Sequence, residues 1–187
     1  MKNIILTGVP RSGKTTISKK ILNEFKNYSL IQGDVITSSY VNMCGLRKDT
    51  KNECVELNMS EAYQMVLDFF NKSIEFEPNL NYILDYHSLK IEDIIKYLKN
   101  GYLVIVFGYP DATIEELVEN TIKYDEKYDW TYTESVRKLE LYFDIWIKDS
   151  NNYKEDCMKN NIKFVNVSKN REDVLNNLLD WIKENNS

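Results

Sequence analysis

The residues with the clearest chemical potential lie near the start of the chain. Residues 8–15 match the pattern G-x-x-x-x-G-K-[ST], the phosphate-binding P-loop. Its glycines let the backbone curl so that successive N–H groups point at a bound phosphate. We expect Lys14 to reach the β- and γ-phosphates of ATP, and Thr15 to ligate Mg²⁺. The residues expected to hold the nucleotide are Gly8, Pro10, Arg11, Ser12, Gly13, Lys14, Thr15 and Thr16.

Two aspartates are candidates for the remaining chemistry. Asp85 closes the apolar run 82–85, as a Walker B aspartate does, and is the second expected Mg²⁺ ligand. Asp34 follows the run 29–32 and could orient or deprotonate an attacking hydroxyl, which phosphoryl transfer requires. The alternative for each is a structural role, as a helix cap or turn residue.

Arginine is scarce in this chain, and three of the arginines are candidates for contact with the ligands. Arg11 lies inside the P-loop and is expected to touch phosphate. The segment 123–137 is expected to form a lid that excludes water from the nucleotide. Arg137, at its end, is the candidate for offsetting charge on the transferring phosphoryl group, with a surface ion pair as the alternative. Contact with substrate stays open for Arg47, His87 and the lid aromatics Tyr124, Tyr128, Trp130 and Tyr132.

The elements that must position these residues follow from the apolar pattern. Apolar runs at 4–7, 29–32, 82–85, 103–107 and 162–167 predict buried parallel strands. Helical periodicity lies between them and after the last one. Helix starts are expected at Ser60 and Ser88, and at two capping boxes, Thr113 with Glu116 and Thr131 with Glu134. Strands alternating with helices predict a parallel sheet covered on both faces, with ligands beyond the carboxyl ends of the strands.

Length and charge narrow the functional classes. The 187 residues fit one domain, 1–187, and the net charge of −5 with no basic tract argues against nucleic-acid binding. No apolar run has transmembrane length and no signal peptide is visible, so we expect no membrane association. Cys44, Cys54 and Cys157 lack metal-ligand spacing, which favours reduced thiols in a cytoplasmic protein.

With these motifs the chain resembles the small P-loop kinases, which include adenylate kinase, shikimate kinase, gluconate kinase and chloramphenicol phosphotransferase. The resemblance implies an α/β three-layer sandwich, with a five-stranded parallel sheet in the order 2-3-1-4-5 and a helical lid. It also implies ATP and Mg²⁺ as cofactors, and an acceptor site after the second strand, where Asp34 stands. The loop 168–170 would lie near adenine.

The chain departs from the nucleoside monophosphate kinases in two respects. The lid region has no arginine before Arg137, and Asp85 is followed by Tyr86-His87-Ser88-Leu89 in place of Gly-(Phe/Tyr)-Pro-Arg. Both differences favour an acceptor that reacts through a plain hydroxyl. The predicted function is therefore ATP- and Mg²⁺-dependent transfer of the γ-phosphoryl group to a hydroxyl of a small molecule. The alternatives are a nucleoside monophosphate kinase and a nucleotide-gated regulatory ATPase.

Overall fold

A parallel β-sheet forms the framework of the protein. The computed structural model describes residues 1–43, 59–87, 89–127 and 129–186. Its five strands lie in the order β2-β3-β1-β4-β5, and every neighbouring pair is parallel. The predicted sheet and its strand order are therefore confirmed. The strands are β1 (Ile4–Gly8), β2 (Tyr28–Gln32), β3 (Asn81–Asp85), β4 (Leu103–Gly108) and β5 (Lys163–Asn166).

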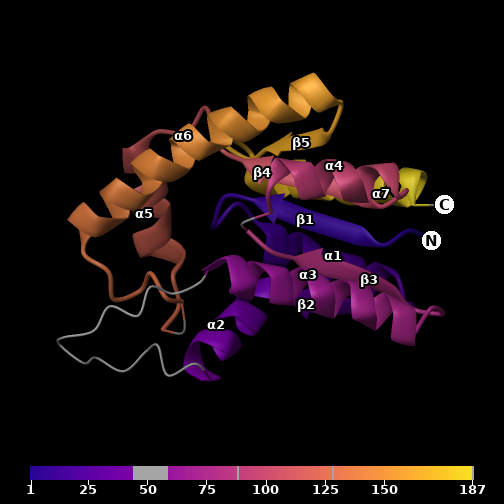
Figure 1. Ribbon diagram of the computed structural model, residues 1–187. Helices are drawn as coiled ribbons and strands as arrows, with labels where there is room; N and C mark the ends of the chain where they lie inside the picture. The colour runs from indigo at the N-terminus through magenta and orange to yellow at the C-terminus, as the bar shows by residue number, and fades with distance from the viewer. Residues whose placement is uncertain (44–58, 88, 128, 187) are drawn as a thin grey trace.

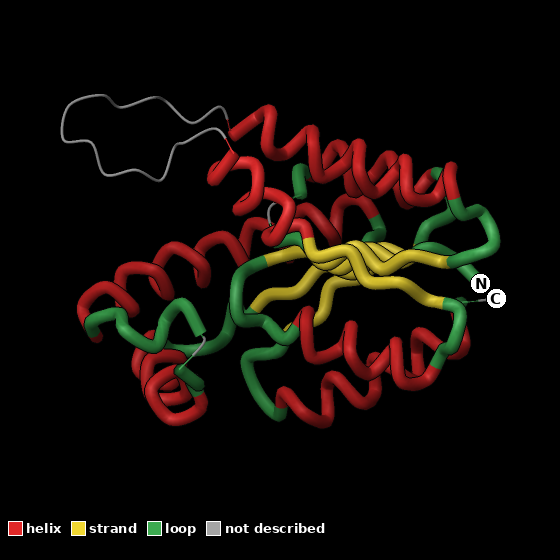
Figure 2. Tube along the Cα trace, turned by 90° about the horizontal axis from the view of Figure 1, so that it is seen from below, coloured by secondary structure: helices red, strands yellow, loops and turns green. Residues whose placement is uncertain are grey.

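Helices cover both faces of the sheet, which gives the three layers seen in Figures 1 and 2. The helices α1 and α7 contribute to the apolar core on one face, and α3 and α4 contribute to the core on the other. The longest helix, α6, extends beyond the carboxyl ends of the strands, where it meets α5 (Figure 1). The bounds are α1 (Lys14–Glu24), α2 (Gly33–Met43), α3 (Met59–Phe76), α4 (Ile91–Lys99), α5 (Ile114–Tyr124), α6 (Val136–Asn160) and α7 (Arg171–Asn185).

The central strands are apolar along their whole length because both of their faces are buried. In β1, Ile5 packs in the core beneath α3 and α4, whereas Leu6 packs in the core beneath α1 and α7. Successive side chains of a strand point to opposite faces, so a strand covered on both sides needs an unbroken apolar run. The same arrangement holds for Val106 and Phe107 in β4. This double burial is why the sequence pattern predicted the strands well.

The predicted helix starts had mixed outcomes. The box at Thr113 is confirmed, because its side chain accepts from the Glu116 N–H at 3.2 Å and Glu116 accepts from the Thr113 N–H at 3.1 Å. The box at Thr131 and Glu134 is wrong, since α6 begins at Val136 after Ser135.

The physical reason is that the Thr131 hydroxyl has charged partners. It accepts from the Arg11 guanidinium at 2.7 Å and donates to the Asp125 carboxylate. Such bonds are stronger than a bond to a backbone amide. Two other helix starts were expected. Ser60 lies inside the first turn of α3, and Ser88 lies outside the described residues.

The two ends of the strands differ in which residues lie there. At the amino ends, the chain termini meet, because the Lys2 N–H donates to Asn186 Oδ1 at 3.0 Å (Figure 1). The carboxyl ends lead into the P-loop, α2 and the segment after β3. The candidate site residues gather at that second end. Among the described residues, no helix combines the length and apolar character needed to cross a bilayer.

Candidate active-site cleft

The P-loop joins β1 to α1, and two glycines give it its shape. Gly8 and Gly13 have φ angles of 112° and 95°, in the region that favours glycine. A Cβ atom on Gly8 would lie 2.0 Å from the carbonyl oxygen of Phe107 in β4, so only glycine fits there. The loop ends at the first turn of α1, whose free N–H groups form an anion site. The local geometry is therefore that of a phosphate cradle.

Lys14 is buried inside this cradle. Its Nζ donates to the carbonyl oxygen of Val9 at 2.7 Å and lies 3.3 Å from that of Gly8. Burial lowers the pKa of Lys14 to about 8, although the Asp85 and Asp34 carboxylates act in the opposite direction. A bound phosphate would replace these neutral carbonyl partners with a charged one, which favours the ammonium form.

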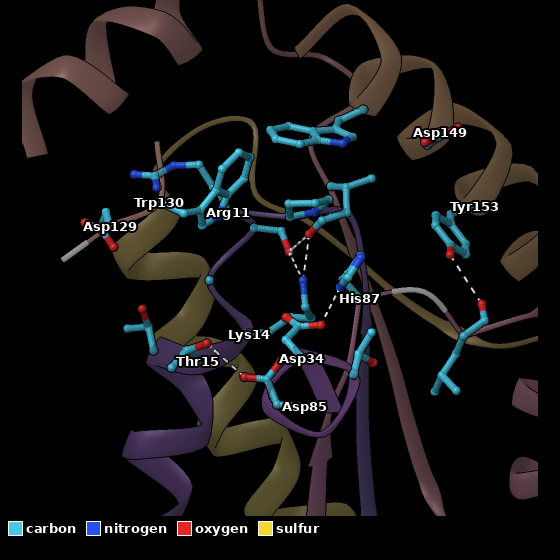
Figure 3. Close-up of a pocket in the computed structure, with 18 of the residues that line it drawn as sticks. Arg11, Lys14, Thr15, Asp34, Asp85, His87, Asp129, Trp130, Asp149 and Tyr153 are labelled. Carbon is cyan, nitrogen blue, oxygen red and sulfur yellow. Dashed lines mark hydrogen bonds and ion pairs between the residues drawn. The ribbon is translucent and has the colours of Figure 1, made fainter. Parts of the chain in front are cut away.

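Thr15 and Asp85 form the pair expected to hold Mg²⁺. The Thr15 hydroxyl donates to Asp85 Oδ2 at 2.9 Å (Figure 3). Desolvation raises the pKa of the buried Asp85, and the Lys14 ammonium opposes that rise. Both side chains offer the hard oxygen ligands that Mg²⁺ prefers, so the pair fits the ion. In the described part of the chain no three His, Cys, Asp or Glu side chains gather around a metal position. Mg²⁺ would thus depend on phosphate oxygens and water as well, as it usually does.

Asp34 lies in the first turn of α2, which begins at Gly33, so it is not the residue before the helix that a capping role requires. Its Oδ1 is 2.6 Å from Nδ1 of His87, and both residues line the cleft (Figure 3). His87 belongs to the segment after β3, so the pair joins α2 to the end of that strand. The carboxylate is held in place yet remains exposed toward the cleft.

Arg11 was expected to touch phosphate, but its guanidinium contacts the lid segment in this structure. It forms an ion pair with Asp125 and donates to Thr131. The Asp125 side chain is only 3% exposed. The backbone of Arg11 is also unusual, because its φ of 59° is left-handed and rare for a residue other than glycine. Arg11 therefore links the P-loop to the chain between α5 and α6.

The lid segment 123–137 contains the end of α5, a loop and the start of α6. Its Tyr124 and Trp130 line the cleft. Trp130 packs edge-on against Trp146, with ring centroids 5.9 Å apart. Arg137 is exposed at the start of α6 and is not among the residues that line the cleft, so the structure does not bring it to the P-loop. Tyr128 and Arg47 lie outside the described residues.

Arg171 is a site residue that sequence reasoning missed. It begins α7, and a Cβ atom on Gly13 would lie 3.1 Å from its Nε. Desolvation and then the Arg11 charge lower the pKa of Arg171, and it has no hydrogen bond or ion pair within the described ranges. A guanidinium in this position can meet a phosphate or the nucleoside. Its place directly after the loop 168–170, in a chain poor in arginine, was the available signal.

Together these residues surround a cleft of about 1500 Å³. Pockets for a single ligand usually measure roughly 300–1,000 Å³, so this cleft has room for two ligands side by side. Its lining includes the P-loop, Arg171, Asp34 and Asp85, so the fold gathers these residues at one place. Figure 3 shows Lys14, Thr15, Asp34 and Asp85 close together at its floor.

Comparison with known proteins agrees with this description. No family model matches the chain. An adenylate kinase from Borrelia garinii subsp. bavariensis is 28% identical over 169 residues, which cover 86% of this chain and 79% of that protein. A shikimate kinase structure from Bacteroides thetaiotaomicron has a TM-score of 0.62 at 11% identity and covers 97% of this chain and 98% of that one.

A second structure, shikimate kinase from Acinetobacter baumannii in complex with shikimate, has a TM-score of 0.59 at 16% identity. It covers 99% of this chain and 94% of that one. The resemblance to the P-loop kinase-like proteins is therefore confirmed, and the fold is the one those kinases share.

Proposed function

We propose that this protein is an ATP- and Mg²⁺-dependent phosphotransferase that moves the γ-phosphoryl group to a hydroxyl of a small molecule. One observation carries the proposal: the phosphate cradle, the Thr15–Asp85 pair and Asp34 all line a single cleft large enough for two ligands. Phosphoryl transfer needs little more than positioning and charge stabilisation, and these groups supply both. The kinase-like fold supports the same reaction class.

The donor side of the reaction depends on cations and backbone amides. Lys14 and the P-loop N–H groups would bind the β- and γ-phosphates, and Arg171, which lies against Gly13 in the cleft lining, would also bind the nucleotide. Thr15 and Asp85 would hold Mg²⁺, which supplies neutralisation of the phosphate charge when bound. These contacts fix the γ-phosphoryl group in the cleft and stabilise the charge that develops during transfer.

The acceptor side depends on Asp34. Its carboxylate would accept a hydrogen bond from the acceptor hydroxyl and take its proton as the new phosphate ester forms. His87 would keep the carboxylate in one orientation through its Nδ1. We also propose that segment 123–137 closes over both ligands and excludes water. The proposed role of Arg137 in offsetting transition-state charge requires this closure, because the residue is exposed here.

A nucleoside monophosphate kinase is the second candidate, and the Borrelia relative named adenylate kinase is the observation that favours it. Such an enzyme must neutralise an acceptor phosphate as well as the ATP. The basic residues of the cleft are mostly on or beside the P-loop and α1, namely Arg11, Lys14, Lys19 and Arg171. The described part of the cleft beyond them contains Lys90 and several carboxylates, which suits a hydroxyl acceptor better.

A substrate panel tests the proposal. The protein is incubated with Mg·ATP and a series of hydroxyl compounds and nucleoside monophosphates, and both ADP and the phosphorylated product are measured. We expect one hydroxyl compound to give product, and Lys14→Ala to lower turnover by roughly two orders of magnitude or more. The matched control is Lys183→Ala, a surface lysine paired with Glu24 and Asp180.

Two results would count against the proposal. Efficient ADP formation with AMP or another monophosphate would establish the second candidate. Binding of Mg·ATP without product from any acceptor, together with ATP hydrolysis that a protein partner stimulates, would establish a regulatory ATPase.

A further inference from the structure

One face of α6 forms a wall of the cleft beyond the P-loop. Trp146, Asp149 and Tyr153 are spaced three and four residues apart, so they share one side of the helix, and all three line the cleft. Figure 3 shows Asp149 and Tyr153 on this helix, across the pocket from Arg11 and Trp130. Asp149 makes neither a hydrogen bond nor an ion pair with any described residue, and its side chain is partly buried. Its charge is thus available to a ligand.

Tyr153 is fixed in this wall, one turn of α6 beyond Asp149. The Tyr153 hydroxyl donates to the carbonyl oxygen of Leu89 at 3.3 Å, so its proton is already in use. Burial raises the pKa of Tyr153 to about 12, and the Asp149 carboxylate adds to the rise. The wall therefore offers a ligand an unpaired carboxylate, with Trp146 and Tyr153 about one turn away on either side along the helix.

The charges of the cleft are divided between its two ends. The cations of the P-loop end can be matched by the phosphates of ATP. The other end, along α6, has Asp149 and Asp156 in its lining. Among the described residues, the lysine that lines this end is Lys90. Its Nζ lies 5.0 Å from the centre of the Tyr63 ring and interacts with that ring. With ATP bound, the described acceptor end therefore remains negative.

We infer that the phosphoryl acceptor is a hydroxylated organic cation, an amino alcohol in the broad sense, whose ammonium group binds at Asp149 and Trp146 while its hydroxyl faces Asp34. The inference rests on the proposed function and names its substrate class. An ammonium group gains from a carboxylate and from the face of an aromatic ring, and both gains are larger where water is partly excluded. An acceptor with a phosphate or carboxylate would meet like charge at the same place.

The reaction balances with no further reactant. The acceptor oxygen forms the new bond to the γ-phosphorus, and the bond from that phosphorus to the β,γ-bridging oxygen breaks. The electron pair of the broken bond leaves with ADP. The hydroxyl proton passes to Asp34 and then to solvent. The ammonium group of the acceptor takes no part in the chemistry, so it serves recognition alone.

Matched pairs of acceptors test the inference with the full-length protein and Mg·ATP. Each pair differs in charge alone or nearly so: choline with its neutral carbon isostere, glucosamine with glucose, and an aminocyclitol with inositol. Shikimate and AMP serve as anionic members. We expect the cationic member of a productive pair to have a kcat/KM higher by about tenfold or more, the factor that one hydrogen bond to a charged group supplies.

Two variants locate the effect on α6. Asp149→Asn should raise the KM for the cationic acceptor by about tenfold while leaving the KM for ATP and the activity with the neutral member nearly unchanged. Asp144→Asn is the matched control, because Asp144 lies on the same helix, pairs with Lys148 at 2.6 Å and does not line the cleft.

The outcomes separate the inference from the proposed function. If neutral or anionic acceptors are phosphorylated as well as the cations, or better, the inference fails and the phosphotransferase stands. An equal effect of Asp149→Asn on cationic and neutral acceptors would also overturn it. If Mg·ATP binds but no member of any class is phosphorylated, the proposed function fails, and the inference fails with it.

Discussion

At the residue scale, the protonation of Lys14 is expected to depend on the ligand. Its pKa in the free protein is about 8, below the ordinary value of 10.5, because it is buried among carbonyl groups. The negative charge of a bound phosphate raises that pKa again. Nucleotide binding near pH 8 should therefore take up a proton, and the affinity should fall as the pH rises above 8.

Calorimetry of ADP binding with EDTA present measures this uptake. The apparent enthalpy at pH 8 should change between buffers of different ionisation enthalpy, and Lys14→Ala should remove most of that change. An enthalpy that is the same in every buffer would show that Lys14 is fully charged before the ligand arrives.

Asp34 gives a second prediction at the residue scale. Asp34→Asn keeps the size of the side chain and a hydrogen-bonding partner for His87, but it removes the group that accepts the proton. We expect ATP affinity to stay within about twofold and transfer to fall by roughly 10²–10⁴, the range for loss of a general base. Asp180→Asn, at an exposed ion pair on α7, is the control. Unchanged transfer in Asp34→Asn would leave Asp34 with a structural role only.

The sequence predicted the local part of the site and missed the part that depends on packing. Residues 8–16 are a contiguous motif whose function depends on their own backbone, so they could be recognised directly. The partner of Arg11 could not, because Asp125 lies 114 residues away and reaches it only through the tertiary fold. Arg171 was missed for the same reason, since α7 brings it against Gly13.

At the element scale, the two predicted capping boxes show when a local sequence pattern correctly predicts the start of a helix. Thr113 starts α5 at an exposed position where nothing competes for its hydroxyl, so the box forms. Thr131 is buried beside the P-loop, and the Arg11 and Asp125 charges take its hydroxyl instead. A capping pattern therefore predicts a helix start only when no stronger partner is in reach.

This difference leads to a stability prediction. Thr113→Ala should lower the free energy of unfolding by about 1 kcal/mol, because it removes the hydroxyl that accepts from the Glu116 N–H. Ser135→Ala, at the start of α6, should cost clearly less, since Ser135 makes no side-chain bond at that helix end. Urea unfolding of the two variants measures the comparison. Equal losses would mean that the Thr113 box does not stabilise α5.

At the scale of the whole molecule, strand order decides which side chains meet. The placement of β1 between β3 and β4 brings the P-loop beside Asp85, and β2 next to β3 brings α2 and Asp34 to the same edge. Alternating strands and helices predicted a parallel sheet whose carboxyl ends meet at one edge, and the resemblance to the P-loop kinases implied the strand order. The charge of the far cleft wall depends on which face α6 turns inward, and that follows only from the packed structure.

The most direct measurement of the central claim follows the γ-phosphoryl group itself. The protein is incubated with Mg²⁺, an amino alcohol acceptor and ATP whose γ-phosphate oxygens carry ¹⁸O, and the products are analysed by mass spectrometry. The account predicts a phosphate ester of the acceptor that carries the label, formed in step with ADP. Label recovered only in inorganic phosphate or in a nucleoside diphosphate, across the full set of hydroxyl acceptors, would contradict it.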